Sequence, residues 1–189
     1  MSIDHPKLIK LLQMAYSAEK AAAFAYIGHA GSVRDPEQKS AIKQIETDEW
    51  GHREAVLKIM RQYEIPISRY NEIKFHLVGK VISLSCYLIG WFMPYYFAGR
   101  LESGNVCEYF VMMHYFNDLG ITEHDEVLYE MGVKEKEHEV YFQECLEGNP
   151  LLPWFERIFG WGKDSSFNDV DLQNLHSVKQ STAYCQHRK

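Results

Sequence analysis

Two copies of one pattern of acidic, aromatic and histidine residues decide the fold prediction. The first copy reads EKAAAFAY at residues 19–26 and EWGH at residues 49–52. The second copy reads ESGNVCEY at residues 102–109 and EKEH at residues 135–138. Residues three or seven apart lie on the same face of an α-helix. Each copy can therefore direct two Glu carboxylates, one His imidazole and one Tyr phenol into a common interior.

The first copy sits on two stretches of helical periodicity, from about residue 7 to 33 and from about 36 to 63. Between them, Asp35 has the chemistry of an N-cap and Pro36 suits the first helical position. Glu19 lies 14 residues before the end of the first stretch, and Glu49 lies 13 residues after Pro36. Both are therefore about 20 Å from the turn, so an antiparallel hairpin places them at the same depth.

The second copy predicts a similar hairpin, with helices over residues 94–117 and from about 122 to 148. Thr122 begins a sequence typical of a capping box. Glu102 lies 15 residues before the end of the first helix, and Glu135 lies 13 residues after Thr122. Glu102 and Glu135 are therefore also expected at the same depth in their hairpin. Glu108, which also has a tyrosine seven residues on, is the alternative to Glu102, although its depth fits less well.

An uncharged run, VISLSCYLIGWFMPYYFAG, occupies residues 81–99. Its length would permit a membrane span, but Pro94 and Gly90 interrupt it. We therefore expect a crossover helix that ends near Trp91 and a bundle helix that begins at Pro94. Two interpretations of the apolar side chains stay open: a buried core, or a surface that lies on a membrane or takes in a lipid-like substrate.

The end of the chain separates into an aromatic stretch and a polar tail. Residues 149–162 predict a short amphipathic helix, which either caps the bundle or anchors the chain at a membrane interface. Residues 163–189 lack periodicity and predict a loosely ordered tail. The predicted domains are therefore a bundle over residues 1–148, the aromatic helix and the tail.

Composition narrows the class of protein. A chain of 189 residues with 46% apolar content predicts one globular domain, and a net charge of -6 argues against a nucleic-acid partner. The four cysteines form no Cys-x-x-Cys pair and predict reduced thiols. The first residues lack the pattern of a signal peptide. We expect a cytoplasmic protein, with peripheral contact to the inner face of a membrane and homodimerisation as further expectations.

The residue types predict a metal centre with two ions. Four carboxylates neutralise two divalent cations, and two imidazoles suit iron better than magnesium or calcium. The absence of thiolates from the pattern argues against structural zinc. The expected cofactor is two iron ions, with manganese as the alternative. The predicted metal ligands are Glu19, Glu49, His52, Glu102, Glu135 and His138.

On these motifs the chain resembles the ferritin-like di-iron carboxylate superfamily over about residues 8–145. The resemblance implies an all-α four-helix bundle with a long crossover between its second and third helices. It also implies that Glu49 and Glu135 bridge the irons, and that Glu19 and Glu102 are outer ligands.

Tyr26 and Tyr109 match the Glu-x6-Tyr feature of rubrerythrins. The resemblance implies a role for both beside the metal ligands. The alternative is two core tyrosines that each make a hydrogen bond.

Within the superfamily two types compete. The demethoxyubiquinone hydroxylase type is a small membrane-associated enzyme of quinone biosynthesis, and the apolar stretches 81–99 and 151–162 favour it. It implies a di-iron monooxygenase that uses dioxygen to hydroxylate an apolar, quinone-like substrate. The rubrerythrin type implies an iron- or peroxide-handling protein, against which the missing Cys-x-x-Cys module counts. A third interpretation is a bundle without activity, whose Glu and His side chains face solvent.

Overall fold

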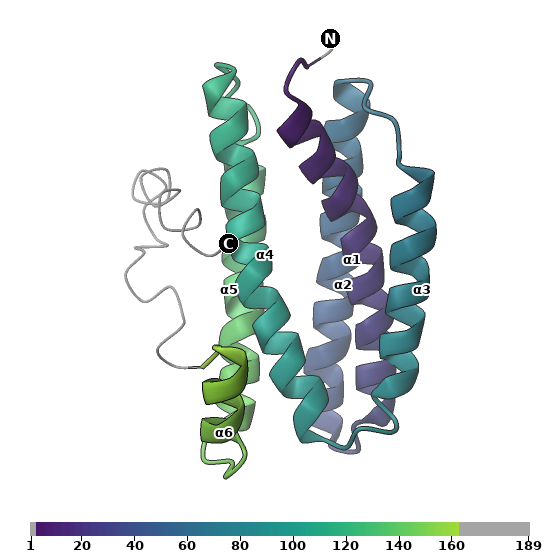
Figure 1. Cartoon of the computed structure of the whole chain (residues 1–189), viewed down its shortest axis with the longest axis vertical. Helices are drawn as coiled ribbons and strands as arrows, with labels where there is room; N and C mark the ends of the chain where they lie inside the picture. The colour runs from purple at the N-terminus through teal and green to yellow at the C-terminus, as the bar shows by residue number, and fades with distance from the viewer. Residues whose placement is uncertain (1–2, 163–189) are drawn as a thin grey trace. The chain divides into compact units, whose positions relative to one another are not determined.

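A computed structural model describes residues 3–162, and every regular element among them is an α-helix (Figure 1). The helices are α1 (Pro6–Ser32), α2 (Pro36–Gln62), α3 (Arg69–Ser85), α4 (Phe92–Asp118), α5 (Asp125–Leu146) and α6 (Leu152–Phe159). The all-α prediction is confirmed. The predicted polar tail lies outside the described residues.

The chain divides into two compact units, Met1–Pro94 and Tyr95–Lys189, and the division falls in the first turn of α4. In the first unit, α1 and α2 form an antiparallel hairpin (Figure 1). The predicted cap is present, because the Asp35 carboxylate accepts a hydrogen bond of 2.8 Å from the backbone N–H of Gln38, and Pro36 is the first residue of α2. At the start of α1, His5 Nδ1 accepts from the backbone N–H of Leu8 at 3.0 Å.

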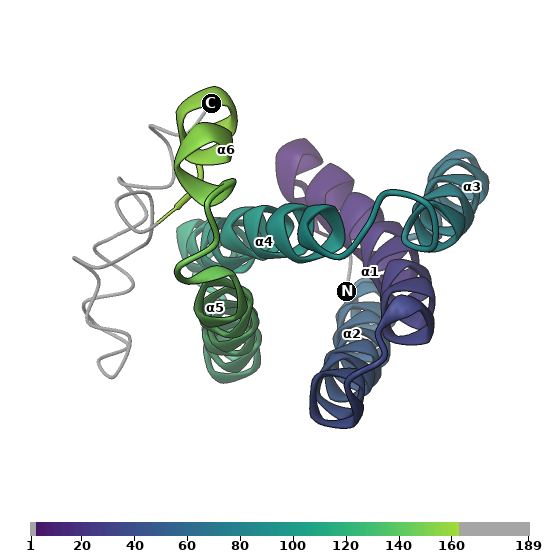
Figure 2. The ribbon, with the colours of Figure 1, turned by 90° about the horizontal axis from the view of Figure 1, so that it is seen from below.

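Helix α3 packs on α1 through small residues, beside the α1–α2 hairpin (Figure 2). Gly79 is buried against α1, where a Cβ atom would lie 2.7 Å from Ala21 Cα. One helical turn further along α3, the Ser83 backbone occupies the space beside Gly28. The helices approach closely because neither glycine carries a side chain, and this contact decides which face of α3 points outward.

The crossover helix ends at Ser85, six residues before the predicted end near Trp91. Helix α3 ends at Ser85, and residues 86–91 form turns that include Gly90 with a φ of +79°. A left-handed backbone of this kind favours glycine and stops a helix. Helix α4 then begins at Phe92, two residues before the predicted Pro94.

The uncharged run 81–99 is divided between surface and core. Val81, Leu84 and Leu88 are exposed, whereas Tyr95 and Tyr96 are fully buried. The core interpretation therefore holds for Cys86 and for the start of α4, but not for the exposed side chains before α4. In the described part of the chain, no helix is long and apolar enough to cross a membrane.

In the second unit, α4 and α5 form an antiparallel pair, since residues near the start of one helix contact residues near the end of the other. Tyr95 packs edge-to-face on Phe142, with ring centres 5.9 Å apart. At the other end, the Asn117 amide donates to the Asp125 carboxylate at 2.8 Å. Between these contacts Gly132 leaves room for the Phe110 ring.

The start of α5 differs from the prediction. Thr122 lies in the turn before the helix, and its backbone carbonyl accepts from the N–H of Asp125 at 3.1 Å. His124 occupies the N-cap position and makes no side-chain cap hydrogen bond. The Asp125 carboxylate holds the corner between α4 and α5 through Asn117, so the capping-box prediction is wrong here.

Helix α6 caps the start of α4. The single Tyr96 O–H proton is shared between the backbone carbonyls of Phe155, at 3.0 Å, and Trp161, at 2.9 Å. Both of these aromatic side chains are buried, whereas Trp154 and Ile158 are exposed. One face of the helix within residues 149–162 therefore packs on α4, and the other is exposed.

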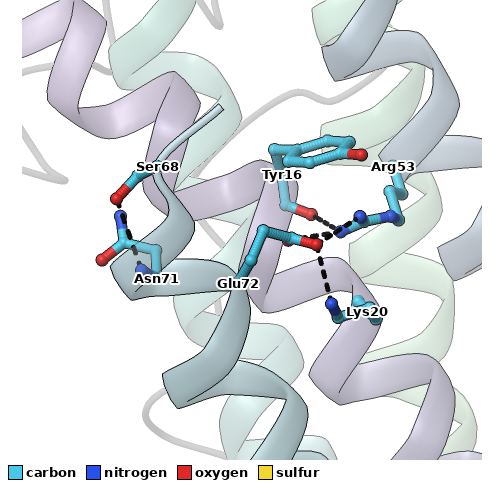
Figure 3. A network of polar contacts seen from close by, with 6 residues as sticks. All are labelled: Tyr16, Lys20, Arg53, Ser68, Asn71 and Glu72. Atoms are coloured by element: carbon cyan, nitrogen blue, oxygen red, sulfur yellow. Dashed lines mark hydrogen bonds and ion pairs between the residues drawn. The ribbon is translucent and has the colours of Figure 1, made fainter. Parts of the chain in front are cut away.

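A polar network joins the three helices of the first unit at Glu72 of α3 (Figure 3). The Arg53 guanidinium of α2 donates two hydrogen bonds to the Glu72 carboxylate, at 2.9 Å and 3.1 Å. Lys20 of α1 contacts the same carboxylate at 2.7 Å, and Arg53 also donates to the backbone carbonyl of Tyr16. Burial raises the pKa of Glu72, but hydrogen bonds from Arg53, Lys20 and Ser17 and the charge of Arg53 lower it to about 2. The charged partners of Glu72 therefore lower its pKa by more than burial raises it.

Replacing Glu72 with glutamine should lower the free energy of unfolding by about 2 kcal/mol, because it weakens hydrogen bonds between charged groups that link α1, α2 and α3. Urea unfolding followed by circular dichroism measures the change. The exposed Glu54 of α2 offers a matched control, and Glu54→Gln should stay within about 0.5 kcal/mol of the wild type. Equal effects of the two substitutions would show that the network adds nothing to stability.

The contribution of Glu72 should also depend on pH. Its folded-state pKa, about 2, lies below the ordinary glutamate value of 4.5, so the stabilisation is complete above pH 4.5 and is lost as the pH falls toward 2. The difference in unfolding free energy between wild type and Glu72→Gln should therefore shrink across this range. A difference that stays constant between neutral and acidic pH would contradict the assignment.

Candidate metal centre

The first unit gathers two carboxylates and an imidazole at one place in the α1–α2 hairpin. Glu19 comes from α1, whereas Glu49 and His52 come from α2. One ligand atom of each residue lies within 4.8 Å of a ligand atom of the other two. All three side chains are buried. We call this set the first triad.

The register of the hairpin and the rotation of its helices produce the first triad. Glu19 and Glu49 lie at the depth that their spacing from the turn predicts. The residues that follow Glu19 and His52 in sequence are Lys20 and Arg53, and both of these bind Glu72 of α3 (Figure 3). Neighbouring residues on a helix point about 100° apart. The Glu72 network therefore holds both helices in a rotation that turns Glu19 and His52 inward.

The second unit contains an equivalent set, the second triad. Glu102 comes from α4, and Glu135 and His138 come from α5. Ligand atoms of these three residues also lie within 4.8 Å of one another, and all three side chains are buried. Each unit thus carries, by itself, a buried set of two Glu and one His.

Asn105 is a site residue that the motif search missed. Its side-chain amide donates hydrogen bonds of 3.3 Å to both Glu102 and Glu135. It joins the carboxylates of two helices and orients them. The signal was present in the sequence, because Asn105 lies three residues after Glu102 and so shares its helix face.

Glu108, the alternative ligand, lies away from the second triad, and the two tyrosines of the motif are core residues. Glu108 is half-buried and lies about 9 Å further along α4 than Glu102, which is the residue that joins the second triad. Tyr26 and Tyr109 are both buried, and the Tyr26 ring stacks on His29 with ring centres 6.4 Å apart. Burial lowers the pKa of His29 to about 4, so this imidazole is neutral at pH 7. A role of either tyrosine beside the metal ligands stays a prediction.

Helix α5 also buries Glu139, a carboxylate outside the triads whose partners lie within the protein. Lys136 contacts it at 2.8 Å and Trp161 Nε1 donates to it at 2.9 Å. A neighbouring lysine therefore balances its charge. Glu139 lies one turn beyond Glu135 and provides a natural comparison for the triad residues.

The donor atoms of each triad fit a divalent transition-metal ion. Carboxylate oxygen and imidazole nitrogen are donors that divalent first-row transition metals accept. Two carboxylates buried beside one another repel, and a dication between them would remove that repulsion. Metal binding would therefore stabilise the folded hairpins.

Comparison of the chain with protein-family models, with curated proteins and with solved structures found no match. Membership of the ferritin-like superfamily therefore stays a prediction from the motifs.

Replacing Asn105 with leucine should weaken ferrous-iron binding by about 10- to 100-fold, because the substitution removes the amide that orients Glu102 and Glu135. Anaerobic titration of the full chain with ferrous iron against a competing chelator measures the affinity. Asn117→Leu, which breaks the α4–α5 corner away from the triad, serves as the control and should leave the affinity unchanged. An unchanged affinity in Asn105→Leu would contradict the positioning role.

Proposed function

We propose that the two triads combine into one dinuclear iron centre, and that the protein is an oxygen-activating di-iron oxidoreductase of the ferritin-like type. The observation that carries the proposal is the repetition: the same buried set of two Glu and one His occurs once in each unit. In the proposed fold, α1, α2, α4 and α5 form a four-helix bundle, and α3 is its crossover.

Charge and ligand number support one shared centre over two separate sites. Three protein ligands fill only half of the six positions of an iron ion, whereas six ligands, two of which bridge, would give each of two ions four protein ligands. Four carboxylates also match the charge of two divalent cations. Glu49 and Glu135 would bridge, Glu19 and Glu102 would bind at the outside, and His52 and His138 would each supply nitrogen.

The protein's own residues supply position and surroundings in this proposal. Asn105 orients the Glu102 and Glu135 carboxylates through its amide. Burial of the triads keeps bulk water from the ligand atoms. When bound, an iron pair with open positions supplies the redox chemistry that activates dioxygen.

We propose an apolar, quinone-like substrate for this centre. The exposed apolar side chains of α3 support this choice, since they suit contact with the apolar phase in which such a substrate dissolves. In the hydroxylation, a C–H bond is replaced by C–OH with one atom of dioxygen. The other atom leaves as water, and a reduced flavin or nicotinamide supplies two electrons, with two protons taken up.

Iron content tests the metal proposal. Protein purified from iron-rich medium should contain close to two iron ions per chain. The double substitution Glu49→Gln and Glu135→Gln should remove nearly all of it, because it takes one carboxylate from each triad without changing side-chain size. Iron measured by plasma emission spectrometry, beside optical spectra, gives the result.

Glu139→Gln is the matched control, since it changes a buried carboxylate of α5 that lies outside the triads. It should lower stability and retain the iron. Wild-type protein without iron after anaerobic reconstitution would overturn the metal proposal and favour a bundle with structural carboxylates. Oxidation of the reduced, iron-loaded protein by peroxide but not by dioxygen would replace the oxygenase with a peroxide-reducing function.

A further inference from the structure

Trp161, just past the end of α6, attaches the end of the described chain to the helices that carry the second triad. Only 2% of this residue is exposed. Gly160 ends α6 with a φ of +66°, a left-handed backbone conformation that favours glycine and redirects the chain. The Trp161 indole N–H then donates to the Glu139 carboxylate of α5 at 2.9 Å. We call residues 160–162 the strap.

The Trp161 ring contacts α4 as well as α5. A Cβ atom on Gly99 of α4 would lie 2.2 Å from the Trp161 ring, so the ring rests on helix backbone that carries no side chain. The same Cβ atom would lie 3.0 Å from Phe142 Cβ, which places Gly99 at the contact between α4 and α5. Gln143 of α5 also donates to the backbone carbonyl of Gly162 at 3.4 Å. The strap is therefore seated where the two helices meet.

The contacts of Trp161 lie about one helical turn from the second triad. Gly99 precedes Glu102 by three residues, or about 4.5 Å, and Glu139 follows Glu135 by four residues, or about 6 Å. Because α4 and α5 are antiparallel, both displacements run toward the same end of the pair. Residues three or four apart also share a helix face. The strap therefore lies next to the second triad at one end of it.

The second unit anchors its ligand helix in the same way as the first unit, through the residues that follow the ligands in sequence. In the first unit, these two residues are cations that bind Glu72 of α3. In the second unit, Lys136 follows Glu135 and Glu139 follows His138. Lys136 contacts Glu139 at 2.8 Å, and Glu139 accepts from the indole of the strap. The strap thus takes the place in the second unit that α3 has in the first.

This arrangement makes the rotation of α5 depend on the strap. Neighbouring residues on a helix point about 100° apart, so Glu139 cannot move without moving His138. If α5 turned to take its ligands away from Glu102, the hydrogen bond between Glu139 and the indole would break and leave a buried N–H without a partner. A metal ion held by ligands from both α4 and α5 would fix the same rotation.

We propose that the strap positions the second triad, so that seating of Trp161 between α4 and α5 and metal binding by the triad favour each other. Trp161 is a positioning residue that acts through Glu139, by holding α5 in the rotation that directs Glu135 and His138 toward Glu102. Such coupling is reciprocal: a strap that raises the affinity for metal is itself held more firmly once metal is bound. The proposal rests on metal binding by the second triad, but not on a shared centre or on oxygen chemistry.

Metal affinity tests one direction of the coupling. Trp161→Phe keeps an aromatic ring beside Gly99 but removes the indole N–H, and it should weaken ferrous-iron binding about tenfold. Glu139→Leu removes the acceptor instead and should weaken binding to a similar extent. Glu139→Gln retains an oxygen that accepts from the indole, so its affinity should stay within about twofold of the wild type. Anaerobic titration of the full chain with ferrous iron against a competing chelator measures all four proteins.

Hydrogen exchange of α6 tests the other direction. The backbone N–H of Phe155 is bonded to Leu151 at 3.1 Å, and that of Gly160 to Glu156 at 2.9 Å, so both exchange only when the helix opens. Ferrous iron should slow their exchange about tenfold in the wild type, by the reciprocity of the coupling. In Trp161→Phe iron should slow it far less. A tryptophan that only stabilised the fold would not produce this difference.

Tyr96→Phe is the matched control, because it removes the O–H that holds the same segment to α4 but leaves the indole bonded to Glu139. It should speed the exchange of α6 amides and keep the iron affinity within about twofold of the wild type. Circular dichroism should show the same helix content in every variant.

Equal iron affinity in the wild type and Trp161→Phe would overturn the coupling while leaving the metal proposal intact. So would exchange of α6 that iron slows to the same extent in both proteins, or a loss of affinity in Tyr96→Phe as large as that in Trp161→Phe. Wild-type protein that binds no ferrous iron would overturn the metal proposal and the coupling with it.

Discussion

Two carboxylates buried side by side are the constraint on which each half of this structure depends. In the first unit the pair is Glu19 with Glu49, and in the second it is Glu102 with Glu135. Burial strengthens the repulsion between such groups, so a folded hairpin that holds them together needs either a positive charge beside them or a proton on one of them. The imidazole in each triad supplies another ligand atom to the same place. A dication bound there would link the helix packing to the proposed chemistry.

Helix α3 shows how one ion network can link the packing of three helices to the candidate site. Glu72 holds the α1–α2 hairpin in the rotation that turns the first triad inward. Because Glu72 binds both Lys20 and Arg53, the same carboxylate ties α3 to α1 and to α2. The pairing that stabilises the first unit thus also fixes the position of the first triad.

The helical hairpins and the triads were predictable because they follow from spacing. Periodicity marks the helices, and equal distances from a turn bring residues such as Glu19 and Glu49 together whatever else surrounds them. Exposure was not predictable in the same way: Leu84 and Tyr95 belong to one uncharged run, yet the first faces solvent and the second is core. Their difference depends on the Gly79 contact with α1 and on the turn at Gly90, which composition does not reveal. Asn105 was missed because amides were left out of the ligand pattern.

Electron paramagnetic resonance of the oxidised, iron-loaded full chain tests most directly the central claim that the two triads share one centre. Two ferric ions joined by bridging ligands couple magnetically, so the account predicts a protein that contains iron but gives almost no resonance of isolated high-spin ferric ions at liquid-helium temperature. An intense resonance that accounts for all of the bound iron would show separate ions in separate triads. That result would contradict the shared centre and, with it, the proposed oxygen chemistry.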